Sequence, residues 1–119
     1  MDIVNIASEA LQPLRDDGIT VVEGWYREDM QKLHVTLYSL GDYEGGHSDD
    51  DPELDIASIQ INIWSKKNQQ SLKNRIRKLM KKNGFLYTGS NDDWESDTGI
   101  YNNAMRFIYA EEVQEEMEE

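Results

Sequence analysis

The sequence predicts a single α+β domain, in which two helices pack on a mostly antiparallel sheet of four to five strands. Two hydrophobic patterns support this fold class. Asp55–Trp64 alternates apolar with polar residues, as a half-buried strand does, and its apolar side consists of Ala57, Ile59, Ile61 and Ile63. Lys66–Asn83 instead has helical spacing, and Gly84 marks its end; its apolar stripe consists of Leu72, Ile76, Leu79 and Met80. We therefore expect Asp55–Gly84 to form a central strand and helix on which the other elements pack.

Three elements are expected before this central unit. Asp2–Leu14 carries apolar residues at helical spacing, with Asp2 as N-cap or first-turn acid, and Pro13 is expected to kink the last turn. Ile19–Trp25 is rich in valine and isoleucine, which predicts a first strand. Leu33–Leu40 alternates apolar with polar residues and predicts a second strand. The polar connection between these two strands favours a hairpin.

Two strands are expected after the central helix. Phe85–Thr88 predicts a short strand, and Tyr101–Ala110 predicts a final one. Phe85–Tyr87 and Met105–Tyr109 should pair as a broad hairpin. The predicted order of elements is therefore α-β-β-β-α-β-β, with residues 1–110 forming the domain.

Three acid-rich segments predict irregular structure. Gly41–Leu54 contains three glycines, one proline and six acids, so we expect a long, mobile loop between two strands. Gly89–Gly99 predicts a second acidic loop. Residues 111–119 contain six glutamates and predict a flexible or loosely helical acidic tail.

Composition argues against several classes of protein. The chain has 119 residues, enough for one domain with a real core, and a formal net charge of −12. That charge argues against a stand-alone DNA-binding protein, because the phosphate backbone repels an acidic surface. The sequence has no cysteine for disulfides or thiolate sites, and no apolar run reaches the roughly 20 residues that span a bilayer. We therefore expect a soluble protein of the cell interior that makes no membrane contact.

The charge is unevenly placed along the chain. Residues 66–82 contain eight of the twelve basic residues and no acid, whereas acids dominate at Asp49–Asp55 and at 111–119. A chain polarised in this way can associate with copies of itself, because the basic helix face of one copy can meet acids from Gly41–Asp55 or Asp92–Asp97 of the next. The candidate interface residues are Lys73, Arg75, Arg77, Lys78 and Lys82 on the helix, Asp49, Asp50 and Asp51 on the acidic side, and Trp64. A merely solvated helix face, and for Trp64 a position covered by a helix, fit the pattern equally well.

No group of residues predicts catalysis. His47 next to Asp49–Asp51 combines metal-binding residue types, but their spacing matches no ligand frame, and a solvated acidic loop explains them better. Gly45 and Gly46 are followed by acids, whereas a phosphate-binding loop would continue with Lys and Ser or Thr. His34 lies on a strand among apolar residues, which predicts a structural role. We therefore expect no enzyme, no cofactor and no metal site.

The order of elements and three segments resemble the tail terminator, or tail completion, proteins of long-tailed bacteriophages. The first segment is the strand Asp55–Ser65, which alternates polar with apolar residues and ends in Trp-Ser. After the long helix, Gly84–Tyr87 is similar to the family's Gly-Phe/Leu-Tyr stretch, and Tyr101–Tyr109 is similar to its aromatic strand. The resemblance spans roughly Ile3 to Tyr109 and carries over no catalytic residue.

This resemblance implies a structural protein of the virion. Members of the family form a ring, usually of six subunits, that caps the tail tube and joins it to the head connector. It implies a tail tube protein and a head–tail connector protein as partners, DNA that slides through the lumen without specific binding, and assembly in the host cytoplasm. Two other interpretations stay open: a small acidic inhibitor or DNA mimic that binds a basic host protein, and another component of the head–tail connector.

Overall fold

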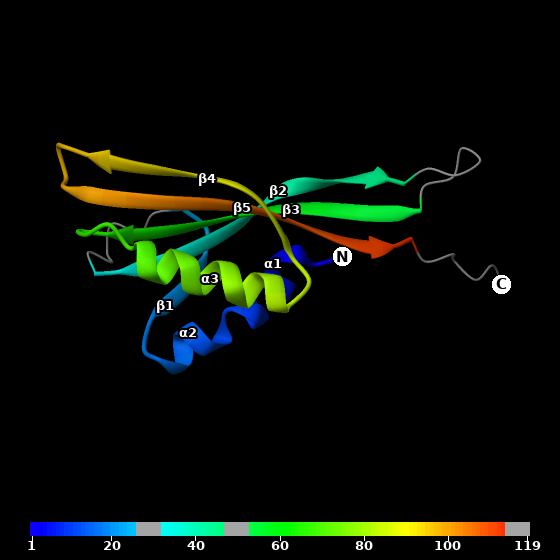
Figure 1. Ribbon diagram of the computed structural model, residues 1–119, viewed down its shortest axis with the longest axis horizontal. Helices are drawn as coiled ribbons and strands as arrows, with labels where there is room; N and C mark the ends of the chain where they lie inside the picture. The colour runs from blue at the N-terminus through cyan, green and yellow to red at the C-terminus, as the bar shows by residue number, and fades with distance from the viewer. Residues whose placement is uncertain (26–31, 47–52, 114–119) are drawn as a thin grey trace.

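A mixed β-sheet forms the centre of the structure, a computed structural model that describes residues 1–25, 32–46 and 53–113 (Figure 1). Within these residues the chain forms five strands and three helices, which confirms the predicted α+β class. The elements in chain order are α1 (Ile3–Ala10), α2 (Gln12–Asp16), β1 (Thr20–Glu23), β2 (His34–Gly45), β3 (Leu54–Ser65), α3 (Gln70–Lys82), β4 (Leu86–Glu95) and β5 (Ile100–Glu112).

The sheet is built around β3, as the alternating pattern predicted. The strand order is β1-β2-β3-β5-β4, and β3 pairs antiparallel with both β2 and β5. One row across these three strands joins Leu37, Ile61 and Met105, and none of the three is exposed to solvent. The predicted pairing of the last two strands is also confirmed, since Tyr87 lies opposite Phe107.

The predicted hairpin between the first two strands is wrong, because β1 and β2 are parallel. Thr20 lies beside His34, and Glu23 lies beside Leu37. Gly24 follows β1 with a φ of 119° and still donates its N–H to the carbonyl of Leu37 on β2. A connection longer than the two to five residues of a tight hairpin leaves the direction of the next strand open.

Parts of the two segments predicted as acidic loops are strands. β2 continues through Gly45 and pairs with the first residues of β3, after a register shift between Ser39 and Gly41. β4 continues to Glu95, and β5 extends to Glu112, so the predicted boundaries at Thr88 and Ala110 are too early. Backbone hydrogen bonds to a neighbouring strand outweigh the weak strand propensity of glycine and acids. Residues 47–52 of the first loop and 114–119 of the tail lie outside the described residues.

The helices follow the predicted pattern with shorter bounds. Asp2 caps α1 by accepting the backbone N–H of Asn5 at 3.1 Å. The predicted N-terminal helix is divided at Leu11, and Pro13 lies in the first turn of α2, where its missing N–H costs no helical hydrogen bond. α3 begins at Gln70 rather than Lys66, and Gly84, with a φ of 90°, follows its end as predicted.

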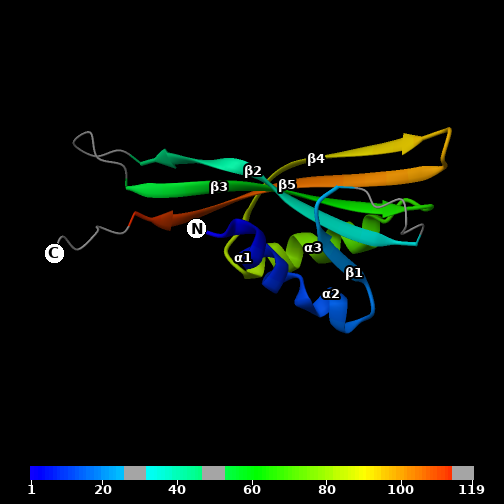
Figure 2. The ribbon, with the colours of Figure 1, turned by 180° about the vertical axis from the view of Figure 1, so that it is seen from behind.

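The helices cover only one face of the sheet (Figures 1 and 2). Ile59, Ile61 and Ile63 of β3 point toward them and form the core with apolar residues of α1 and α3: Ala7, Leu72, Ile76 and Met80. Within the described residues no helix covers the opposite face, which we call the open face. The sheet also extends beyond the helices at both ends, which gives a molecule of 55 × 27 × 24 Å.

The buried row of the sheet gives a direct test of this arrangement. Ile61→Ala should lower the free energy of unfolding by about 2–5 kcal/mol, because it leaves a cavity between β3 and the helices. Leu86→Ala is the matched control, since Leu86 is 63 % exposed, and it should change stability by less than about 1 kcal/mol. Denaturant unfolding of both variants would measure the difference, and equal losses would show that the wrong face of the sheet has been assigned to the core.

Candidate functional site

The cations of α3 divide into two groups. Lys73 was predicted on the surface, but it is buried, and its ammonium group lies 3.1 Å from the Asp92 carboxylate. Arg75 forms an ion pair with Asp17, and the Arg77 guanidinium lies 3.9 Å from the ring centre of Tyr87. These three predicted interface residues therefore make contacts within their own chain.

Asp92 is the polar centre of the contact between α3 and the sheet. It accepts hydrogen bonds from Lys73, from the Asn103 amide at 2.8 Å and from Gln70 at 3.1 Å. Partial burial works to raise the pKa of Asp92, but the hydrogen bonds from Asn103, Lys73 and Gln70, together with the Lys73 charge, bring it below its ordinary value. Asn103 also accepts the backbone N–H of Gln69, next to the first residue of α3. This group therefore fixes the start of α3 on β4 and β5.

The remaining cations form the cationic helix surface, which consists of Lys78, Lys81 and Lys82. All three are exposed on the helical side of the molecule, where Lys78 and Lys81 also line a pocket with Leu86 and Tyr87 of β4. Their side chains make no hydrogen bond or ion pair with any residue in 1–25, 32–46 or 53–113. Three ammonium groups on one helix, without acids between them, give this side of an acidic molecule a local positive charge.

The open face carries polar and aromatic residues in register across four strands. Pairing aligns Thr36 with Asn62 and Ala104, and aligns Tyr38 with Gln60 and Arg106. On β4, the alternate residues Asn91, Asp93 and Glu95 belong to the same face. Burial raises the pKa of the Tyr38 hydroxyl, against the opposing effects of the Asn62 amide and the Arg106 charge. This face is therefore a polar, partly buried surface without a covering layer.

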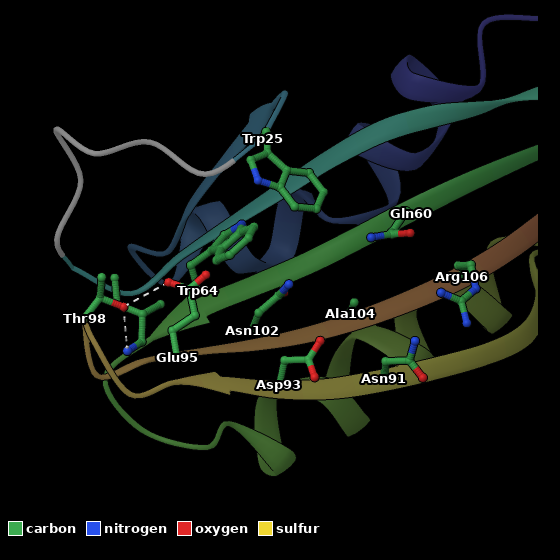
Figure 3. Close-up of a pocket in the computed structure, with 11 residues that line it drawn as sticks. Trp25, Gln60, Trp64, Asn91, Asp93, Glu95, Thr98, Asn102, Ala104 and Arg106 are labelled. Carbon is green, nitrogen blue, oxygen red and sulfur yellow. Dashed lines mark hydrogen bonds between the residues drawn. The ribbon is translucent and has the colours of Figure 1, made fainter.

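A pocket of about 390 Å³ lies on the open face (Figure 3). Its aromatic wall is the indole of Trp25, which is 53 % exposed and packs edge-on against Trp64 with ring centres 5.2 Å apart. The wall is held in place because the Trp64 Nε1–H donates to the Thr36 hydroxyl at 2.8 Å. Trp64 was considered as a partly exposed interface residue at a sheet edge; instead it is buried in the central strand, and Trp25 is the exposed indole.

The pocket has an acidic part and a basic part. Glu95 lies with Thr98 at one end, Asp93 lies on the floor, and Arg106 lies at the other end (Figure 3). Glu95 accepts a hydrogen bond from the Thr98 hydroxyl at 3.1 Å. The Asn102 Oδ1 is buried in the pocket wall and has no hydrogen-bond partner among the described residues. A pocket with two carboxylates on one side and an exposed indole on the other has groups that favour a cationic ligand.

The sequence-predicted residues are therefore only partly brought together. Trp64 lies in the pocket, but the helix cations lie on the other side of the sheet, and Asp49, Asp50 and Asp51 are outside the described residues. Sequence reasoning missed Trp25, and it offered Asp92–Asp97 as possible acidic partners of the helix without recognising the strand that carries Asp93 and Glu95. The signal for the last two was the period-two spacing of Asn91, Asp93 and Glu95, which was read as an acidic loop because the segment is rich in acids.

The chain matches no protein-family model, and no curated protein matches it significantly. Among the described residues, no group of three or more His, Asp or Glu side chains is placed to hold a metal ion. No helix in the described part of the chain is long and apolar enough to cross a membrane.

The Asp92 contact predicts an effect that depends on pH. Asp92→Asn should lower the free energy of unfolding at pH 7 by about 1–2 kcal/mol, because it removes the charge that pairs with buried Lys73. This loss is in the lower part of the range for a buried charge that loses its partner, because the Asp92 side chain is 35 % exposed and solvent screens its interaction with Lys73. Because the pKa of Asp92 is depressed in the folded state, the difference should persist down to its ordinary pKa of 3.8 and vanish as pH falls further.

Asp93→Asn is the matched control for this measurement. Asp93 is the next residue along β4 but belongs to the open face, and it makes no side-chain hydrogen bond with a described residue. Its substitution should leave stability unchanged within about 0.5 kcal/mol. Denaturation curves of both variants between pH 7 and pH 3 would provide the test, and identical curves for the two would contradict the role assigned to Asp92.

Proposed function

We propose that this protein is a non-enzymatic structural subunit that assembles with copies of itself into a ring. The sequence resemblance extends the proposal to a tail terminator of a long-tailed bacteriophage, in a ring of six subunits. In that role the ring forms in the host cytoplasm, caps the tail tube, contacts the head–tail connector and lets DNA pass without specific binding. In the finished virion it stands at the head–tail junction.

The observation that carries this proposal is the placement of opposite charges on opposite sides of one sheet. The cationic helix surface lies on the helical side, whereas Asp93 and Glu95 lie on the open face. When one copy uses its helical side against the open face of another, each copy still has one surface free. Such a contact is heterologous, and repeating it gives a ring if the rotation between neighbours closes.

The uncovered sheet face supports the same proposal. A largely antiparallel sheet commonly leaves one face to solvent, but the open face here also has a pocket and an exposed indole, which are features of a binding surface. Individual exposed ion pairs contribute only about 0–1 kcal/mol, so a ring contact needs several of them together with buried surface. The open face offers both charged side chains for ion pairs and surface that a neighbour can bury. The alternative of an acidic inhibitor or DNA mimic is less well supported, because the cationic helix surface interrupts a uniformly acidic exterior.

The proposal predicts that assembly depends on the helix lysines. Lys78→Glu with Lys82→Glu should shift the protein toward monomer while leaving its unfolding midpoint within about 3 °C, because neither side chain has a partner among the described residues. Native mass spectrometry and analytical ultracentrifugation at several protein concentrations would measure the oligomer. Electron microscopy with isolated tail tubes would show whether wild-type rings cap them, as a tail terminator should and another connector component should not.

The control reverses two exposed lysines outside α3. Lys32→Glu with Lys67→Glu changes the net charge by the same amount, and both residues are exposed. This variant should assemble as the wild type does. If both double variants dissociate to the same extent, the effect is one of total charge and the helix surface has no special role. If the wild type stays monomeric at every concentration and in the presence of tail tubes, the proposed function is wrong.

A further inference from the structure

We infer that the pocket on the open face receives lysine side chains from the α3 helix of a second copy of this chain. The inference rests on the proposed function, because it assigns the partner of the same interface. It names Lys78 and Lys82 as the entering residues and Asp93 and Glu95 as the receiving ones. The occupant is therefore a second copy rather than a small molecule or an unrelated protein.

The pocket has the groups that a partly desolvated ammonium requires. An ammonium group taken out of water is costly unless charges and hydrogen-bond acceptors replace its hydration. Asp93 and Glu95 supply two carboxylates, and the exposed face of Trp25 supplies a ring for a cation–π contact. The wall is rigid, since Trp25 packs against Trp64 and Trp64 donates to Thr36. A cation therefore meets a preformed site on this face.

The spacing of the charged groups matches between the two surfaces. Lys78 and Lys82 lie four residues apart on α3, which corresponds to a rise of about 6 Å along one side of the helix. Asp93 and Glu95 lie two residues apart on β4, on one face, which corresponds to about 6.8 Å along the strand. A helix laid along β4 can thus present one ammonium group to each carboxylate.

The other cations of α3 are less suitable as donors to a second copy. Lys73 is buried against Asp92, Arg75 pairs with Asp17, and Arg77 lies over Tyr87. Arg106 lies at the far end of the pocket and would repel a cation there, so the favourable part of the pocket is the end that holds Glu95 and Thr98. This leaves the lysines on the outer side of the helix to fill the acidic end.

The buried Asn102 carbonyl oxygen is consistent with a surface that a partner completes. It lies in the pocket wall without a hydrogen-bond partner among the described residues. Buried polar atoms in folded proteins are nearly always satisfied, and each exception needs an explanation. A lysine from a neighbour brings three N–H donors into this wall.

The test is a charge exchange in the full chain. Asp93→Lys with Glu95→Lys should raise the dissociation constant for self-association at least tenfold, and Lys78→Glu with Lys82→Glu should do the same. The variant that combines all four substitutions should recover assembly to within about threefold of the wild type, because each contact again pairs opposite charges. An equimolar mixture of the two double variants should also assemble, with the two kinds of subunit alternating.

The matched control uses acids with the same spacing on another strand. Asp42 and Glu44 are exposed, lie two residues apart on β2 and pair in register with Ala57 and Asp55. Asp42→Lys with Glu44→Lys changes the net charge as much as the pocket variant does, and it should assemble normally. If the pocket variant fails to fold by circular dichroism, Asp93→Asn with Glu95→Gln replaces it, with a smaller loss of assembly expected.

The outcomes separate this inference from the proposed function. If the wild type forms oligomers and the pocket variant forms them equally well, the inference is overturned while the ring proposal stands. If the pocket and β2 variants lose assembly alike, the inference is again overturned, because the loss then reflects total charge. The four-substitution variant regains the net charge of the wild type, so its recovery supports the pairing only together with normal assembly of the β2 variant, which excludes total charge as the cause. A wild type without oligomers overturns both.

Discussion

The structure depends on the burial of one side of a single strand. β3 is central in the sheet, and its isoleucines must be covered because each contributes apolar area that water disfavours. α1 and α3 provide that cover, and the pairing of β2 and β5 with β3 extends the buried row on both sides. Because the pleat alternates, the same constraint turns Gln60, Asn62 and Trp64 to the other face. The polar open face is thus a consequence of the core.

Much of the fold could be predicted from the spacing of apolar residues along the sequence alone. The alternation in β3 and the apolar stripe in α3 are strong signals because each element has one solvent-exposed and one buried side. Gly84 follows the end of the helix where expected. The direction of β1 could not be predicted, since a parallel pairing depends on where the following connection leads and not on the strand itself. The length of β4 was also missed. Its acids have low strand propensity, and only the partner strand β5 explains why they are extended.

The candidate site was harder to predict than the fold for a physical reason. A run of basic residues marks an exposed helix surface only if none of them pairs with an acid of the same chain. Residue type alone does not show that Lys73 and Arg75 form such pairs whereas Lys78, Lys81 and Lys82 do not. The pocket combines residues from the end of β1, from β3, from β4 and from β5. Sites that combine distant segments leave little local signal, and here the only one was the spacing of Asn91, Asp93 and Glu95 on a strand that sequence reasoning did not recognise.

The position of β4 as an edge strand of the sheet has a further consequence for solubility. β4 pairs with β5 on one side only, so its other side presents unpaired backbone groups along ten residues. An exposed edge strand can pair with strands of other chains and start fibrillar aggregation. Natural proteins oppose such pairing with charged side chains on the edge. Asp92, Asp93 and Glu95 lie on this strand and supply the kind of charge that opposes such pairing. A change that removes these charges would therefore also raise the tendency of the chain to aggregate through β4.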